Sequence, residues 1–267
     1  MPRGFQPAVL TTSACPLCGG RLVPQWPAAR IWRCLSCELR LRHPLPDEAA
    51  LRDLYRAAWE TPGVHSAETG GTSMELAREY TRRLLATLNL DDFGGLRLIE
   101  LGAGDGAMSR ALRERGAEVF AVEPYGYDGL LAQGIDAYRT LDDLPASSPF
   151  DGAVCLEVVE HLTAPWAELK KLRSTLKPSA WILVTTPNVT GLNARLNAEH
   201  WREARKPGHV VWFAPRTLEL LLMRAGFPRC RRLKWHMGSR GSPAGLPRWA
   251  LQLLGLDGRL QYLAHAV

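Results

Sequence analysis

Three closely spaced glycines form the first group of residues with a recognisable chemistry. Gly102, Gly104 and Gly106 alternate with other residues between a short apolar run and the start of a helical pattern. Strand, glycine turn and helix open a nucleotide-binding βαβ unit, in which the backbone approaches the ligand too closely to tolerate a Cβ. The same spacing also satisfies the dinucleotide fingerprint, so the glycines alone leave the cofactor undecided.

Acidic residues on either side of the glycines distinguish between the cofactors. Glu100 stands two residues before Gly102, at the end of the expected strand. A carboxylate there would repel a pyrophosphate and attract an ammonium group. Glu123 ends the next apolar run, about twenty residues past the glycines, where an acid accepts hydrogen bonds from ribose hydroxyls. An acid for an amine and an acid for a ribose indicate S-adenosylmethionine in preference to NAD.

A second group of ionisable residues follows the fourth expected strand. Glu157, Glu160 and His161 would share one face of a helical turn, since they stand at positions i, i+3 and i+4. Two carboxylates and an imidazole can bind a catalytic divalent cation, and His209 could complete the set from a later loop. Alternatively, neutral His161 or His209 accepts the proton of a hydroxyl, with Glu160 beside it. A purely structural role for His161 is also open.

Four cysteines near the N-terminus form two C-x2-C pairs with fifteen residues between them. This spacing is typical of a four-thiolate zinc site, and we assign Cys15, Cys18, Cys34 and Cys37 to one structural Zn²⁺. Two disulfides or unpaired thiols are the alternative. Residues 1–14 contain no apolar block of signal-peptide length. We therefore expect a cytoplasmic protein, in which thiols stay reduced and the metal is favoured.

Strand-like and helix-like segments alternate along the rest of the chain. This predicts an α/β fold, with a doubly wound, Rossmann-like, mostly parallel sheet and a small N-terminal zinc ribbon. We expect a zinc ribbon-like domain over 1–45, a helical linker or cap over 46–90 and an S-adenosylmethionine-binding methyltransferase domain over 91–267. The expected strands are Arg97–Glu100, Glu118–Val122, a strand near Ala137, Gly152–Leu156 and Trp181–Thr185; the expected helices are Ala107–Arg115, Tyr127–Gln133 and Pro165–Leu176.

The connecting segments carry weaker signals. Residues 47–59 are expected to form a helix whose apolar face includes Tyr55. A capping box at Thr72 predicts the start of the next helix. The polar stretch 61–71 is either a lid over the cofactor or an idle connection, and 238–245 is expected to be a linker. The tail after residue 260 is expected to return as an antiparallel strand or to form an amphipathic helix at a dimer or membrane surface.

In combination, these motifs resemble the class I S-adenosylmethionine-dependent methyltransferases, and among them the ubiquinone-biosynthesis O-methyltransferases. The resemblance implies that Asp142 contacts the adenine amino group, with an exposed surface acid as the alternative. We also assign Glu157 to the cofactor side of the pocket. The Glu-x-x-Glu-His pattern is similar to that of metal-using small-RNA 3′-end methyltransferases. The matching segments are Glu100–Gly106, Ala121–Pro124, Phe150–His161 and His209–Phe227.

The expected function is methyl transfer to a small molecule, at a hydroxyl of a sugar, nucleotide-linked or aromatic metabolite. Basic and aromatic residues between 191 and 215 suit a ring attached to a phosphate. The alternatives are an RNA methyltransferase whose zinc ribbon holds the phosphate backbone, and a protein that binds the cofactor without chemistry. A net charge of +6 does not by itself demand nucleic acid. No apolar run reaches the length of a membrane span, and a homodimer is left open.

Overall fold

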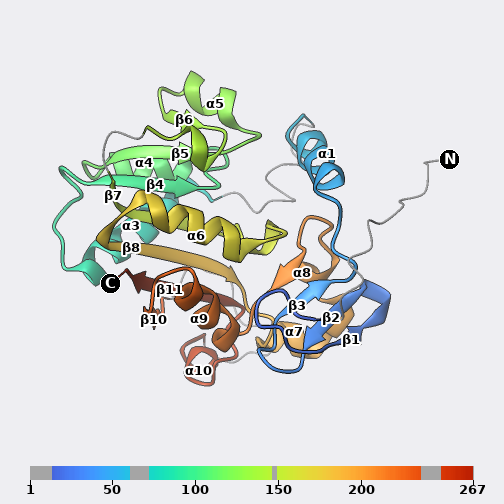
Figure 1. Ribbon diagram of the computed structural model, residues 1–267. Helices are drawn as coiled ribbons and strands as arrows, with labels where there is room; N and C mark the ends of the chain where they lie inside the picture. Colours follow the sequence, from blue (N-terminus) through green and yellow to red (C-terminus); the bar gives the residue numbers. More distant parts are fainter. Residues whose placement is uncertain (1–13, 61–71, 146–148, 236–247, 267) are drawn as a thin grey trace.

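Two β-sheets organise the protein in the computed structural model, which describes residues 14–60, 72–145, 149–235 and 248–266 (Figure 1). The larger sheet has seven strands in the order β10-β11-β8-β7-β4-β5-β6. Segments 1–13, 61–71 and 238–245, on which some expectations rest, lie outside the described residues. The strands of the large sheet are β4 (Arg97–Leu101), β5 (Glu118–Val122), β6 (Asp136–Tyr138), β7 (Phe150–Leu156), β8 (Leu176–Pro187), β10 (Arg229–Arg232) and β11 (Arg259–His265).

The large sheet confirms the predicted doubly wound, mostly parallel architecture. β4 pairs in parallel with both β5 and β7, and the parallel set extends to β6 and β8. The C-terminal strand β11 pairs antiparallel with β8 and with β10, which confirms the strand alternative for the tail. Parallel strands need long crossovers, so helices separate them in sequence. The helices are α1 (Glu48–Glu60), α3 (Met74–Leu88), α4 (Ala107–Arg113), α5 (Tyr127–Ala132), α6 (Pro165–Thr175), α7 (Leu192–Asn197), α8 (Arg202–Arg205), α9 (Pro215–Arg224) and α10 (Arg248–Leu253).

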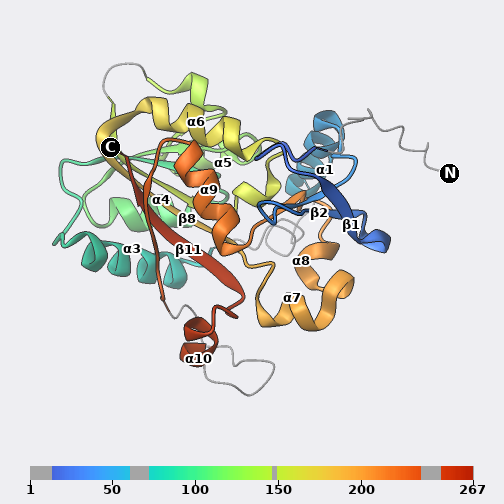
Figure 2. The same ribbon diagram turned by 60° about the horizontal axis from the view of Figure 1, so that its bottom comes forward.

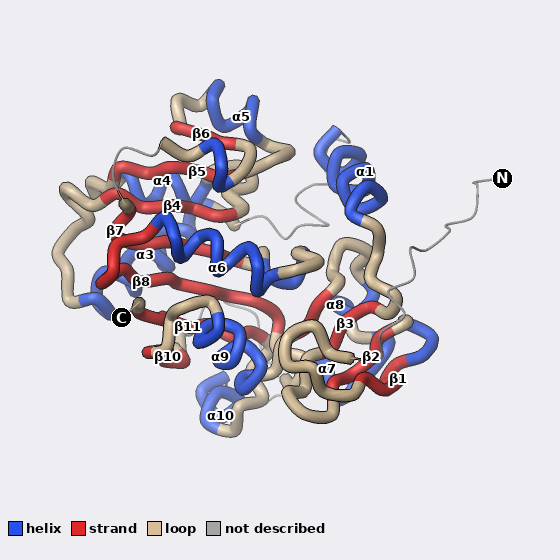
Figure 3. The backbone as a smooth tube through the Cα atoms, viewed as in Figure 1, coloured by secondary structure: helices blue, strands red, loops and turns tan. Residues whose placement is uncertain are grey.

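Helices cover both faces of the large sheet, and alternate side chains of each strand face opposite layers (Figure 3). In β4, Ile99 and Leu101 pack with the buried leucines of α6 and α9, whereas Leu98 packs with those of α3 and α4. Both sets are almost fully buried. Because β4 packs against helices on both faces, its carboxyl end is held in place. The glycine turn begins directly after that end.

The smaller sheet contains the predicted ribbon strands β1 (Leu22–Trp26) and β2 (Ile31–Cys34), followed by β3 (Arg40–Arg42). Its fourth strand, β9 (Val211–Trp212), comes from far along the chain and pairs antiparallel with β3. Figures 1 and 2 both show α7 and α8, which precede β9, beside the ribbon strands. The ribbon sheet is therefore completed by a strand from the part of the chain that also forms the large sheet.

Several element ends differ from the sequence-based expectations. Strand β8 starts at Leu176 and directly follows α6, so it is longer than predicted. Helix α3 is capped by Ser73, whose hydroxyl accepts a hydrogen bond from the Leu76 amide, and not by Thr72. Among the described residues, no helix combines the length and apolar character needed to cross a bilayer.

Candidate functional site

The glycine turn after β4 has the backbone conformation that its spacing predicts. Gly102 and Gly106 have φ angles of 72° and 81°, in the region that favours glycine. A Cβ on Gly102 would also collide with the side chain of Val158 at the end of β7. The turn therefore needs glycine for its own shape and for its close approach to the neighbouring strand.

Glu123 lies directly beside this turn. Its carboxylate accepts hydrogen bonds from the backbone amides of Gly104 and Tyr125, both at 3.0 Å. Burial raises the pKa of Glu123, while these amides act in the opposite direction. The carboxylate is thus fixed at the place where the sequence predicted a ribose acceptor.

Glu100 is buried at the end of β4 and accepts a hydrogen bond from the hydroxyl of Ser109 in α4. Burial raises the pKa of Glu100 to about 8, and the nearby charges of Asp105 and Glu123 act in the same direction. A cationic group beside Glu100 would offset this desolvation and favour the ionised carboxylate. The surroundings of Glu100 therefore match a positively charged ligand and oppose an anionic one.

A cavity of about 620 Å³ is lined by all of the predicted cofactor residues except Gly106. Its floor is the glycine turn, and one wall is helix α1, which contributes Leu51, Tyr55 and Trp59. Three predicted cofactor or catalytic residues, Gly106, Glu160 and His209, are absent from its lining within the described residues. The predicted residues that do line the cavity are Glu100, Gly102, Gly104, Glu123, Asp142, Glu157 and His161.

His161 stands at the cavity wall, and its contacts allow the tautomer of the ring to be assigned. Its Nδ1 lies 3.1 Å from the carbonyl oxygen of Gly208 and 2.8 Å from the Tyr55 hydroxyl, which itself donates to Gly208 at 2.7 Å. Because a carbonyl only accepts, Nδ1 carries the proton and Nε2 keeps a free lone pair. Burial lowers the pKa of His161 to about 4, so the imidazole is neutral at pH 7.

Glu160 and His209 lie behind His161 in the protein interior. The Thr186 hydroxyl donates to Glu160 Oε2 at 2.9 Å, and the His161 and His209 rings are 4.6 Å apart. Within the described part of the chain, Glu160 Oε1 and His209 Nδ1 are buried without hydrogen-bond partners. One ligand atom from each of Glu160, His161 and His209 lies within 4.8 Å of the others. This oxygen and nitrogen donor set fits a divalent transition-metal ion.

The expectation that Glu157 shares a helical face with these residues is wrong. Glu157 has a φ of 56° and precedes the short 3-10 turn Val159–His161, so it lies outside the helical register. Its carboxylate instead accepts a hydrogen bond from the Thr185 hydroxyl at 2.8 Å and lies 3.1 Å from Nε of Arg259. Strand β11 therefore supplies a half-buried counter-charge, Arg259, and Glu157 pairs with it instead of joining Glu160 and His161.

Tyr55 and Trp59 are among the cavity residues that were not identified as functional from the sequence. Tyr55 and Trp59 lie at helical spacing in α1, and the apolar face that includes Tyr55 indicated only a packing surface. Both line the cavity, and Tyr55 bonds to the predicted base His161. The sequence did contain an indication of their role. Tyr55 and Trp59 are aromatic rings with a polar edge, and such rings suit the half-buried wall of a ligand cavity.

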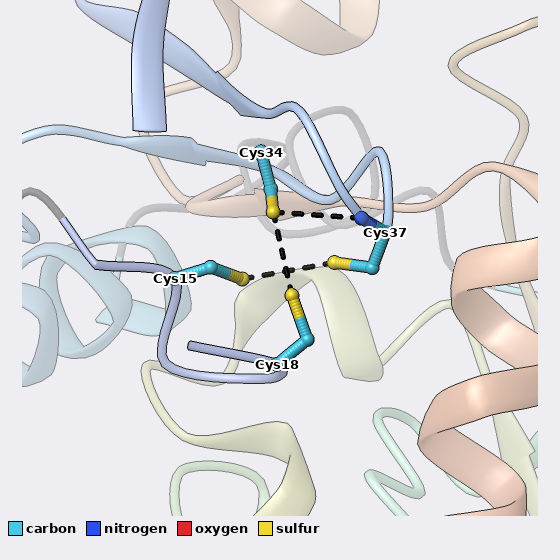
Figure 4. Close-up of side chains that lie close together, drawn as sticks. All are labelled: Cys15, Cys18, Cys34 and Cys37. Atoms are coloured by element: carbon cyan, nitrogen blue, oxygen red, sulfur yellow. Dashed lines mark hydrogen bonds between the residues drawn. The ribbon is translucent and has the colours of Figure 1, made fainter. Parts of the chain in front are cut away.

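The four cysteines of the two C-x2-C pairs lie close together, with their sulfurs pointing toward one another (Figure 4). The sulfur of Cys15 lies 3.7 Å from that of Cys37, and Cys18 and Cys34 are 3.4 Å apart. A tetrahedral ion with Zn–S bonds of about 2.3 Å separates its sulfurs by about 3.8 Å, whereas a disulfide requires about 2.05 Å. Amides of both knuckles also point at the sulfurs, including Gly20 N to Cys18 Sγ at 3.4 Å. The cluster fits zinc and excludes disulfides in this conformation.

The strand order, the acidic glycine turn and the cavity above it define the class I S-adenosylmethionine-dependent methyltransferase fold. The family model described as "Methyltransferase domain" matches residues 73–228, and the chain belongs to this family.

Curated relatives include ubiquinone biosynthesis O-methyltransferases. That of Cereibacter sphaeroides strain KD131 is 32% identical over 161 residues, which cover 54% of this chain and 64% of the relative. The enzyme of strain ATCC 17025 is 34% identical over 162 residues with the same coverage. The similarity therefore spans 64% of the length of these relatives.

Solved structures share the fold. A SAM-dependent methyltransferase from Archaeoglobus fulgidus is 22% identical with a TM-score of 0.54, covering 75% of this chain and 96% of that one. The Burkholderia thailandensis 1,6-didemethyltoxoflavin-N1-methyltransferase, solved with 1,6-didemethyltoxoflavin and S-adenosylhomocysteine, is 16% identical with a TM-score of 0.55. It covers 87% of this chain and 97% of its own. At these identities the similarity concerns the fold alone.

Proposed function

We propose that this protein is an S-adenosylmethionine-dependent O-methyltransferase whose acceptor is a hydroxyl group of a small molecule. The observation that carries the proposal is the lining of one cavity. A carboxylate for an amine (Glu100), a carboxylate for a ribose (Glu123) and a neutral imidazole with a free lone pair (His161) all face the same space. Family membership and the curated O-methyltransferase relatives support this assignment.

Each cavity residue has a distinct proposed role. Glu123 accepts hydrogen bonds from the ribose hydroxyls, and Glu100 pairs with the ammonium group of the methionine end. Asp142 lies at the cavity rim, where it pairs with Lys171 and could receive the adenine amino group. Glu157, held by Arg259, adds negative charge to the cofactor side. Together these acids favour a cationic sulfonium compound over a dinucleotide.

His161 is the proposed general base. When bound, S-adenosylmethionine supplies a methyl group activated by its sulfonium sulfur. The protein then has to align the acceptor hydroxyl and receive its proton. His161 Nε2 is suited to this role because Nδ1–H is held by the Gly208 carbonyl and the ring is neutral at pH 7. His209 packs edge-on against the ring and limits its rotation.

A catalytic divalent cation is the alternative to the base role of His161, since Nε2 cannot both bind an ion and receive the proton. Glu160, His161 and His209 would hold it, since Glu160 Oε1 and His209 Nδ1 are buried and have no hydrogen-bond partner in the described structure. Glu203 Oε2 lies 3.8 Å from His209 Nδ1. Bound there, such an ion would lower the pKa of a nearby acceptor hydroxyl. Titration with Mn²⁺ or Co²⁺ would show whether the site binds, and Glu160→Gln should abolish that binding without affecting the cofactor.

The ribbon is proposed to hold a structural zinc ion that takes no part in the chemistry. Four thiolate ligands leave no open coordination position for chemistry. A site built from reduced thiols also fits the proposed cytoplasmic location.

The acceptor is proposed to be small. Leu51, Tyr55 and Trp59 from α1 give the cavity an apolar and aromatic wall, which suits a flat or sugar ring, with or without a linked phosphate. RNA remains the alternative acceptor. Against it, the ribbon arginines Arg33 and Arg40 are engaged internally, with Glu38 and with Gln25 at 2.7 Å. Arg21 and Arg30 of the ribbon are exposed, so the internal contacts weigh against RNA binding at Arg33 and Arg40 only.

Calorimetry and a methyl-transfer screen test the proposal. We expect saturable binding of S-adenosylhomocysteine, no binding of NAD, and label transfer from methyl-labelled cofactor to a hydroxyl in a panel of sugars, nucleotide sugars and phenols. His161→Gln should reduce turnover by about 10²–10⁴-fold while leaving cofactor affinity intact. Binding of NAD in place of S-adenosylhomocysteine would refute the proposal, and methylation of RNA alone, with steep salt dependence, would favour the alternative.

A further inference from the structure

The loop that carries His209 is attached to the zinc ribbon as well as to the methyltransferase sheet. The amide of Arg42 in β3 donates to the carbonyl oxygen of Val210 at 2.9 Å, and β3 then pairs with β9. On the next helix, the Thr217 hydroxyl donates to the carbonyl oxygen of Cys37 at 2.5 Å. Figures 1 and 2 both show α8, which precedes this loop, alongside the ribbon strands. Ribbon and loop therefore form one hydrogen-bonded unit.

The guanidinium of Arg42 donates its hydrogen bonds to backbone carbonyls and lies over the indole of Trp212 in β9, with 5.4 Å between Cζ and the ring centroid. Its Nε donates to His209 at 2.9 Å, and Nη2 donates to Lys206 at 2.9 Å and to Ala204 at 3.2 Å. Its Nη1 donates to Ala29 of the ribbon at 3.0 Å. No carboxylate pairs with Arg42 in the described ranges. A charged group that is largely buried against four carbonyls fixes the course of the chain around it.

The same loop meets the catalytic cavity on its other side. The carbonyl oxygen of Gly208, one residue before His209, accepts from the Tyr55 hydroxyl and from Nδ1–H of His161. The amide of Val210 donates to the carbonyl oxygen of Glu160 at 2.8 Å. Displacement of the loop would therefore remove the acceptor that selects the tautomer of His161.

We propose that Arg42 is a positioning residue for methyl transfer, through which the ribbon holds the Gly208 carbonyl and the His209 imidazole against His161. The inference builds on the proposed function, in which His161 is the base. Lysine cannot replace Arg42, because a single ammonium group does not reach carbonyls on opposite sides as a planar guanidinium does. The ribbon thus acts on the reaction without touching either substrate.

Nitrogen NMR of the histidine side chains tests the proposal without an acceptor. Long-range proton–nitrogen spectra of the zinc-loaded full chain should show His161 with a protonated Nδ1; His161→Gln and His209→Gln provide the assignment. In Arg42→Met we expect His161 to become a mixture of tautomers and the His209 signals to move. Arg40→Met is the matched control, since Arg40 is buried on the same strand but bonds to Gln25.

Kinetics give the second measurement. Arg42→Met should lower kcat by about tenfold, while the affinity for S-adenosylhomocysteine stays within twofold of the wild-type value. Should Arg42→Met fail to fold, Arg42→Lys is measured in the same way and should show the same tautomer mixture. Unchanged His161 and His209 spectra in a folded Arg42 variant would overturn the inference. The spectra do not depend on methyl transfer. A lack of cofactor binding would therefore count against the proposed function and leave the test of Arg42 unaffected.

Discussion

The hydroxyl of Tyr55 lies 2.8 Å from Nδ1 of His161, and both groups share the carbonyl oxygen of Gly208. A residue of the N-terminal helix α1 is thereby part of the hydrogen-bond network of a side chain at the end of β7. The proposed base is consequently held by groups from two distant parts of the chain, Tyr55 and Gly208.

Tyr55→Phe should weaken this network. His161 keeps its bond to Gly208, but the carbonyl loses one donor and the ring gains freedom. We expect turnover to fall by about tenfold, equivalent to about 1.4 kcal/mol, with cofactor affinity unchanged. Tyr138→Phe is the matched control, because Tyr138 lies in β6 outside the cavity lining. Equal turnover of Tyr55→Phe and the wild type would show that the phenol contributes nothing to the reaction.

Glu123 is expected to dominate ribose recognition. Glu123→Gln should weaken binding of S-adenosylhomocysteine by about 10- to 100-fold, since charge-assisted hydrogen bonds contribute about 1.5–3 kcal/mol. Glu118→Gln on the same strand is the control, because Glu118 is exposed and far from the cavity lining. Calorimetry measures both. Equal affinities for the two variants would exclude a ribose contact at Glu123.

Glu100 should make the stability of the ligand-free protein depend on pH. The pKa of Glu100 rises from 4.5 unfolded to about 8 folded. Between these values the folded state holds a proton that the unfolded state has released, so the contribution of Glu100 to stability falls as pH rises. The slope for one group is at most about 1.4 kcal/mol per pH unit.

Urea unfolding of the zinc-loaded protein between pH 5 and pH 8.5 measures this contribution. Glu100→Gln should lose that part of the pH dependence, whereas Glu118→Gln should keep it. If wild type and Glu100→Gln showed parallel stability profiles, Glu100 would not be a buried, protonated acid in the free protein.

Zinc removal should destabilise the ribbon and the loop attached to it. We expect one zinc per chain by elemental analysis, and its loss in Cys34→Ser with a lower thermal midpoint, because metal binding and folding are coupled in such small domains. Cys230→Ser is the control, since Cys230 lies in β10 outside the cysteine cluster. Metal-free protein with two disulfides by mass spectrometry would contradict the assignment.

The cofactor half of the site follows from local sequence because its determinants are local. The pattern of apolar residues predicts strand β4. The positive φ angle of position 102 and its closeness to Val158 both call for glycine there. Glu123 comes at the end of the next strand in the parallel sheet, so its place beside the turn follows from topology.

The acceptor half depends on contacts between distant segments. Glu157 adopts a φ of 56°, which its residue type does not indicate, and its partner Arg259 lies about a hundred residues later on β11. Tyr55 looks like a core residue until α1 is placed over the cavity. The pairing of β3 with β9 joins positions 40–42 to 211–212, and a two-residue strand has no sequence signature of its own.

The shared sheet has a practical consequence for protein engineering. A truncated chain beginning at residue 46 would uncover one edge of β9 and the indole of Trp212, which is fully buried in the intact protein. Such an exposed edge invites aggregation. An exchange of N-terminal segments with a related enzyme should therefore transfer residues 188–215 together with the ribbon.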